Sequence, residues 1–134
     1  MRPGPASLAL FFAALILYGS AFAQDEVPPG TIHELRRADL SGAPGMEVIT
    51  SRIEYQPGQG VRLHSHHGVE TGYVIQGAMI QMPGKEPTML QTGATIWNLR
   101  DVPHGGYRVV GDTPLVLLTV HIVDKGKPVY EYVR

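Results

Sequence analysis

Short apolar and β-branched runs, separated by turn residues, fill the chain from Met46 onward, and this punctuation restricts the possible folds more than any other feature. A turn signal recurs about every eight to twelve residues, which is the spacing typical of an antiparallel sandwich or barrel. The separators supply glycines that accept a positive φ or prolines of fixed φ, as in Pro57-Gly58, Pro83-Gly84 and Thr92-Gly93. No segment of this region has the periodicity of an amphipathic helix. The sequence therefore predicts an all-β domain.

The predicted strands follow directly from these runs. They are Met46 to Tyr55, Val61 to His66, Val69 to Gln76, Ala78 to Met82, Thr88 to Gln91, Ala94 to Asn98, Gly106 to Val110, Leu115 to Val123 and Val129 to Val133. The stretches Val74 to Ile80 and Leu115 to Val123 are apolar on both faces, so we expect both to be buried on both sides. An earlier run, Thr31 to Arg36, is expected to pair with an exposed sheet edge, which a neighbouring subunit can supply.

The start of the chain has the features of an export signal. Arg2 gives a positive charge, Leu8 to Tyr18 is an apolar run, and Ala21-Phe22-Ala23 has the form of a cleavage site. A membrane-spanning helix needs about 20 apolar residues, which this run does not reach. We therefore expect a periplasmic or secreted protein with no stable membrane anchor after cleavage. The expected division of the chain is a signal peptide at 1–23, an N-terminal arm at 24–45 and one barrel domain at 46–134.

Charge and cysteine content exclude several functions. The chain has 11 lysine and arginine residues against 12 acidic residues, and the basic residues form no cluster, so nucleic acid is not an expected partner. It has no cysteine, which excludes disulfides, thiolate ligands and cysteine nucleophiles. Any metal site must therefore use histidine and carboxylate.

One short stretch carries most of the metal-binding potential. His64 and His66 are two positions apart, so in a strand both rings point to the same face. A hairpin through His67-Gly68 would bring Glu70 beside them, and His104 is a further candidate. Imidazoles and a carboxylate suit Fe, Mn, Zn, Ni or Cu, so the sequence predicts one divalent transition metal ion without deciding which.

The spacing of glycine, histidine and glutamate in this region resembles the first sequence motif of the cupin family. The matching positions, in residue type and in spacing, are Gly58, His64, His66, Glu70 and Gly77. In the second motif Gly93 and His104 keep the register. The proline, glycine and asparagine of that motif are replaced by Leu99, Asp101 and Arg108. Asp101 tolerates left-handed backbone better than most other residues, so it can hold the turn.

The resemblance covers Met46 to Val123 and implies both a fold and a site. The implied fold is all-β, a single-domain cupin jelly-roll β-barrel, also called a double-stranded β-helix. The implied metal ligands are His64, His66, Glu70 and His104. The resemblance also implies a tendency to form homodimers.

Four further side chains are candidates for a role in the pocket. Arg62 shares its face with His64, and Arg108 with His104, so either could bind an anionic substrate group; the alternative is a solvated arginine. Tyr107 and His121 are the candidates for a catalytic base. Tyr107 could equally fill the barrel, and His121 could be a core residue, since it lies on an apolar strand.

The reaction is not determined by the fold, because cupins host many chemistries as well as non-catalytic binders. Three imidazoles and one carboxylate leave two positions of an octahedral shell open, enough for a small oxygen-bearing substrate and O2. The first hypothesis is therefore a metal-dependent oxidoreductase of the dioxygenase kind. The alternatives are a Lewis-acid isomerase or lyase, and a periplasmic module that binds a small molecule or metal without catalysis.

Overall fold

The computed structural model describes residues 26–134, and its strands follow the predicted runs closely. The strands are β1 (Thr31–Asp39), β2 (Met46–Tyr55), β3 (Gly60–Val61), β4 (His64–Ser65), β5 (Gly68–Gln76), β6 (Ala78–Gln81), β7 (Thr88–Leu90), β8 (Thr95–Asn98), β9 (Tyr107–Val110), β10 (Leu115–Asp124) and β11 (Glu131–Tyr132). The predicted signal peptide lies outside the described residues. Within them, no helix is long and apolar enough to cross a membrane.

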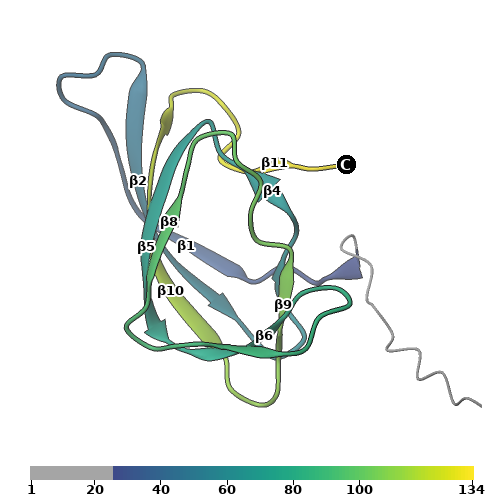
Figure 1. The fold of residues 1–134 in the computed structure, drawn as a ribbon. Helices are drawn as coiled ribbons and strands as arrows, with labels where there is room; N and C mark the ends of the chain where they lie inside the picture. The colour runs from purple at the N-terminus through teal and green to yellow at the C-terminus, as the bar shows by residue number, and fades with distance from the viewer. Residues whose placement is uncertain (1–25) are drawn as a thin grey trace, which may run out of the picture.

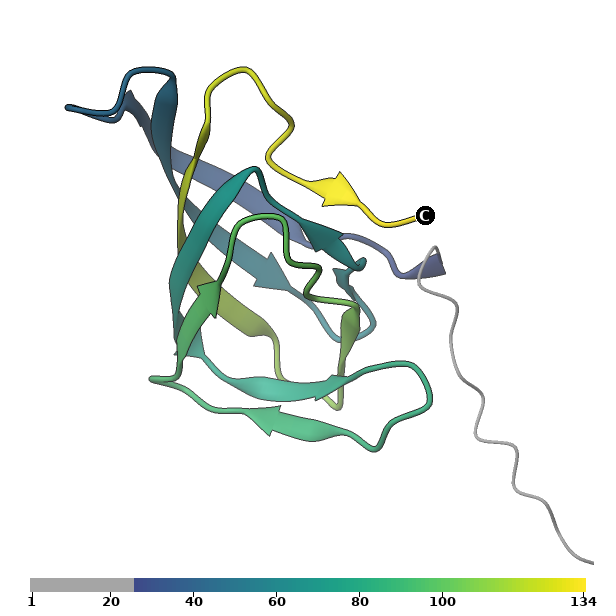
Figure 2. The ribbon, with the colours of Figure 1, turned by 45° about the horizontal axis from the view of Figure 1, so that its top comes forward.

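The strands form antiparallel sheets that wrap around a common interior (Figures 1 and 2). The five-stranded sheet has the order β1-β2-β10-β5-β8, and the four-stranded sheet has the order β3-β9-β6-β7. A small ribbon of β11 and β4 completes one end. The predicted all-β fold is thus confirmed.

The apolar core lies where residues of the two larger sheets meet. Register places Leu117 of β10 between Ile53 of β2 and Val74 of β5, and all three side chains are buried. Further along the inward face of β10 come Thr119 and then His121, which are also buried. The interior therefore changes from aliphatic to polar along β10, and its polar part holds the candidate site.

Two details of the predicted strands are wrong. The run Val61 to His66 is not one strand, because the chain changes partners within it: β3 pairs with β9, and β4 pairs with β11. The hairpin expected at His67-Gly68 does not form either. The chain passes there into β5, which pairs with β10 and β8 rather than with β4. Glu70 reaches the histidines across the barrel interior, not across a hairpin.

The expectation that Val74 to Ile80 is buried on both faces is also wrong. Val74 is fully buried, but Ile75 is 45% exposed. The stretch is broken at Gly77, where a Cβ would lie 2.3 Å from the carbonyl oxygen of Leu90. β5 ends and β6 begins on either side of this close approach, so the continuous apolar stretch belongs to two different sheets.

The run predicted before Met46 forms β1, which is longer than expected. It pairs antiparallel with β2 of the same chain, with a register shift between Glu34 and Arg36. β1 is an edge strand, and all of its residues are exposed. The predicted pairing with a barrel edge is therefore confirmed within one chain, while the homodimer stays a prediction.

Candidate metal centre

Four histidines and one glutamate converge at the polar end of the barrel. His64 lies in β4, and His66 is the first residue after this strand. Glu70 comes from β5 and His121 from β10, where the two are paired across the strands. His104 comes from the loop between β8 and β9, which an isolated antiparallel bridge joins to His64. The cluster thus unites all four predicted ligands with a histidine from the apolar strand.

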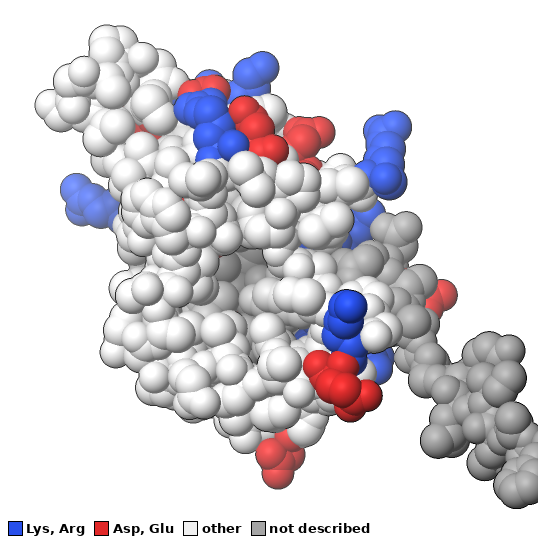
Figure 3. Space-filling model, viewed as in Figure 1, with Lys and Arg blue, Asp and Glu red and all other residues white. Residues whose placement is uncertain are grey.

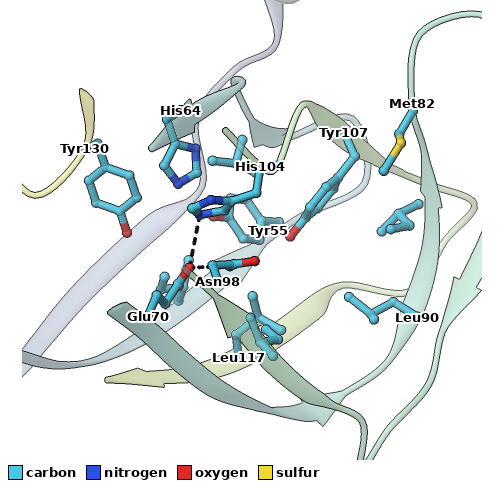
Figure 4. A pocket seen from close by; sticks show the side chains of 15 residues that line it. Tyr55, His64, Glu70, Met82, Leu90, Asn98, His104, Tyr107, Leu117 and Tyr130 are labelled. Atoms are coloured by element: carbon cyan, nitrogen blue, oxygen red, sulfur yellow. Dashed lines mark hydrogen bonds and ion pairs between the residues drawn. The ribbon is translucent and has the colours of Figure 1, made fainter. Parts of the chain in front are cut away.

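The ligand atoms of this cluster lie at short distances from one another. Nε2 of His66 is 3.0 Å from Nε2 of His104. Oε2 of Glu70 is 3.2 Å from Nε2 of His104 and 3.3 Å from Nε2 of His66. Ligand atoms of His64, His66 and His104 all lie within 4.8 Å of one another, and so do those of His66, Glu70 and His121. Figure 4 shows His64, His104 and Glu70 pointing to one region of the site.

These separations fit a shared ion. Ligand atoms at about 2.1 Å from one ion lie about 3.0 to 3.4 Å apart when they are neighbours in octahedral or tetrahedral geometry. The printed sequence offers no thiol, and imidazole with carboxylate is a donor set for divalent transition metals. The cluster is therefore able to hold a metal ion.

The backbone orients three of the four rings. His64 and His104 each donate Nδ1–H to the carbonyl oxygen two residues earlier, at 2.7 and 2.9 Å respectively. His66 uses its Nδ1 for the carbonyl oxygen of Val129. With an ion bound, each of these bonds would leave the lone pair of Nε2 to the metal, which is the usual arrangement around metal-binding histidines.

Burial sets the charges of the cluster. It lowers the pKa of both His64 and His121 to about 4, because an apolar setting disfavours the imidazolium form. Burial alone would raise the pKa of Glu70, but hydrogen bonds with His104 and His66 outweigh it and lower that pKa. At neutral pH Glu70 is therefore ionised and His64 and His121 are neutral, as metal ligands must be.

Asn98 is a site residue that the sequence did not reveal. It lies opposite Glu70 in the pairing of β8 with β5, and its Nδ2 donates a 2.7 Å hydrogen bond to Oε2 of Glu70. It thereby holds the carboxylate oxygen that also faces His66 and His104. In the sequence, Asn98 is marked only as a polar residue at the end of the apolar run that starts at Ala94.

A cavity of about 190 Å³ adjoins the cluster (Figure 4). His64, Glu70 and His104 form one end, and Met82 and Leu90 lie at the other end. The remaining walls are mostly aliphatic, interrupted by three tyrosines: Tyr55, Tyr107 and Tyr130. Burial raises the pKa of all three phenols, so they stay protonated at neutral pH and can donate hydrogen bonds.

Tyr130 is the second residue that the sequence did not reveal. It lies just before β11, and its ring centroid is 4.9 Å from that of His64 and 5.3 Å from that of His66. The C-terminal segment thus lies against the cluster, held by the bond from His66 to Val129. No periodicity could place this tyrosine, because β11 is only two residues long.

The other predicted pocket residues divide into two pairs. Tyr107 lines the cavity, and His121 joins the metal cluster. Arg62 and Arg108 do not line this cavity. The guanidinium of Arg62 lies 4.8 Å from the ring centroid of Tyr132, and Arg108 lies in β9 opposite Gly60. A substrate-binding role for the two arginines remains a prediction.

The surroundings of the site carry little charge. Among residues 26–134, no lysine or arginine lines the cavity. In Figure 3 the central part of the face in view is uncharged, and charged side chains gather near its top and its lower right. His67 lies outside the cluster, and its Nδ1 is 3.4 Å from Oδ1 of Asp101. The backbone of Asp101 has a φ of 59°, which confirms the left-handed turn predicted there.

Comparisons with known proteins agree with this architecture. The family model described as "Cupin domain" matches residues 51–121. A search of curated proteins finds no match. A cupin-like protein from Thermotoga maritima is 21% identical, with a TM-score of 0.58 over 90% of this chain and 89% of that one. An uncharacterised Klebsiella pneumoniae protein with a double-stranded beta-helix domain is 17% identical, with a TM-score of 0.58 over 84% and 96%.

Enzymes also occur among the similar structures. The polyketide cyclase RemF from Streptomyces resistomycificus is 21% identical, with a TM-score of 0.55 over 81% of this chain and 76% of that one. Similarity at this level of identity shows a shared fold.

Proposed function

The chain belongs to the cupin family, and from this premise we propose that it is a metal-dependent enzyme that activates a small, mostly apolar molecule through an oxygen donor. One observation carries this proposal: a buried histidine and glutamate cluster opens into a mostly apolar cavity. In such a cavity a ligand is oriented by the few polar groups and enclosed by the apolar walls. The proposed metal ligands are His64, His66, Glu70 and His104.

A divalent ion bound there would act as a Lewis acid on a carbonyl or hydroxyl oxygen of the substrate. The protein contributes the remaining functions. Glu70 is kept ionised, and Asn98 fixes its position. The apolar walls exclude water, which strengthens every electrostatic interaction in the site.

Tyr130 and Tyr107 are the proposed proton-handling groups. Tyr130 lies beside the histidine cluster, and Tyr107 faces the same cavity from the other side, with its hydroxyl toward Asn98 (Figure 4). Because both phenols stay protonated at neutral pH, each can donate a hydrogen bond to a substrate oxygen on which negative charge develops. Such a donor can assist elimination, isomerisation or cyclisation.

The cavity also limits the substrate. Its volume of about 190 Å³ is below the range of about 300 to 1,000 Å³ that is usual for drug-sized ligands. In the described part of the chain, its lining has no lysine or arginine to neutralise an anionic group distant from the metal ligands. We therefore propose a small, uncharged or singly anionic substrate whose oxygen lies at the histidine end and whose apolar part lies toward Met82.

An oxidative reaction is the second candidate. The predicted donor set of three imidazoles and a carboxylate also suits Fe(II), so the dioxygenase hypothesis keeps its chemical basis. Non-catalytic binding is the third. In each case we propose the exported location and homodimer that the sequence led us to expect.

Activity measurements in the presence and in the absence of O2 separate the three candidate functions. The mature protein, loaded with Zn(II), Mn(II) or Fe(II), is incubated with small hydroxy-carbonyl and hydroxy-acid compounds, with and without O2. The proposal predicts turnover that is independent of O2 and is reduced in Tyr130→Phe, with Tyr132→Phe as the matched control. Turnover that consumes O2 would favour the oxidoreductase instead, and saturable binding without turnover would favour the binding module.

A further inference from the structure

His121 is the one histidine of the cluster that no backbone carbonyl orients. It is 1% exposed, on the inward face of β10. Within residues 26–134, neither of its ring nitrogens has a hydrogen-bond partner. A buried imidazole needs a partner for at least one nitrogen, because its desolvation is otherwise uncompensated. The lack of a protein partner therefore points to a ligand.

The surroundings of His121 identify the direction of that ligand. Its Nε2 lies 3.5 Å from Oε1 of Glu70, whereas the other carboxylate oxygen, Oε2, faces His66 and His104. Its ring centroid is 4.5 Å from that of His66. Ligand atoms of His66, Glu70 and His121 lie within 4.8 Å of one another, as do those of His64, His66 and His104. His66 belongs to both groups, so the two groups adjoin one another.

We propose that His121 is a fifth protein ligand of the metal ion, in addition to His64, His66, Glu70 and His104. This inference rests on the proposed function, since it concerns the same ion. The main alternative is that His121 only positions Glu70 by donating a hydrogen bond to Oε1. A separation of 3.5 Å is too long for a good N–H···O bond, and the ligand atoms of His121, His66 and Glu70 lie close enough together for a shared ion.

A fifth ligand changes what the site can bind. Four imidazoles and one carboxylate oxygen fill five positions of an octahedral shell and leave one open. The open position accepts one substrate oxygen, so a substrate and O2 cannot both bind unless a protein ligand leaves. A site with one open position accepts substrates that coordinate through a single carbonyl, hydroxyl or carboxylate oxygen. Such a site favours Lewis-acid chemistry over dioxygenation.

X-ray absorption spectroscopy of the zinc-loaded protein tests the fifth ligand directly, because the multiple-scattering features of imidazole give the number of bound histidines. We expect four imidazoles in the wild type and three in His121→Leu. Zinc affinity, measured by competition with a chelator, should fall about tenfold or more in that variant. The matched control is Thr119→Val, which changes a buried polar residue on the same face of β10 and should leave both values unchanged.

Three imidazoles in the wild type, with equal zinc affinity in His121→Leu, would overturn the inference and leave the proposed function intact on four ligands. Failure of the wild type to bind zinc or any other divalent transition metal would overturn both. Since the histidine count in the wild type needs no variant, the test remains decisive even if His121→Leu fails to fold.

Discussion

Glu70 and Asn98 face each other across β5 and β8, and Nδ2 of Asn98 donates a hydrogen bond of 2.7 Å to Oε2 of Glu70. The same oxygen is the one nearest to His66 and His104. One amide therefore fixes the carboxylate oxygen that lies at the centre of the cluster. This relationship makes Asn98 a positioning residue for the proposed metal.

Replacing Asn98 with alanine should weaken metal binding without abolishing it. The carboxylate would lose the bond that orients it, and removal of such a partner typically costs about 10- to 100-fold in metal affinity. Chelator competition measures the change. Asn98→Asp should also change the metal affinity, because a second carboxylate would lie against Glu70. An affinity of Asn98→Ala equal to that of the wild type would show that Glu70 is held by other contacts.

Neighbouring histidines should differ sharply in their importance. His66→Ala should bring metal occupancy close to zero, because Nε2 of His66 lies 3.0 Å from Nε2 of His104 and 3.3 Å from Oε2 of Glu70. His67→Ala should keep the metal, because His67 pairs with Asp101 outside the cluster. Elemental analysis of the purified variants measures this. Equal loss in both variants would mean that the ligand assignment is wrong.

The metal-free protein should become less stable as the pH falls from about 6.5 to about 4. Burial lowers the pKa of His64 and His121 to about 4, below the ordinary value of about 6.5 expected in the unfolded chain. In this range the unfolded chain binds more protons than the folded protein, so protonation favours unfolding. His104, whose pKa is raised, opposes the effect, but it is one group against two.

Urea unfolding of the metal-free protein at pH 7 and at pH 5 measures this dependence. We expect a lower free energy of unfolding at pH 5, and a smaller difference in His121→Leu than in the wild type. A free energy that is unchanged or higher at pH 5 would contradict the burial of these rings in their neutral form.

The strand β1 gives a prediction about assembly. It is an exposed edge strand that carries the apolar side chains of Ile32 and Leu35 at 49% and 58% exposure. We expect that shortening the chain to start at Met46 weakens the proposed homodimer, because it removes this edge and exposes β2 in its place. Sedimentation velocity measures the assembly. A shortened protein that keeps the oligomeric state of the full mature chain would argue against a role for β1.

Most of the strands could be predicted from the sequence because turn residues mark them directly. β2, for example, has the bounds expected from its run. The prediction failed where one run serves two sheets, as in Val61 to His66, which the structure divides into β3 and β4. Local sequence cannot show such a change of partner, because it depends on the close approach of backbone from a distant strand.

The difference between local patterns and long-range strand pairing also explains which site residues could be predicted. His64, His66, Glu70 and His104 could be predicted because their spacing resembles a cupin motif. The remaining site residues reach the cluster through long-range register, and no local pattern marks them: Asn98, His121 and Tyr130. His121 was recognised as a pocket candidate, but its position opposite Glu70 follows only from the pairing of β10 with β5.

The central claim is that this cupin barrel holds one divalent transition metal ion. Metal analysis of the purified protein, combined with thermal unfolding in the presence and absence of chelator, tests it most directly. We predict about one ion per chain and a lower melting temperature after chelation, because only the folded state assembles the ligands. A protein that contains no divalent transition metal, and whose melting temperature does not respond either to chelator or to added metal, would contradict the claim.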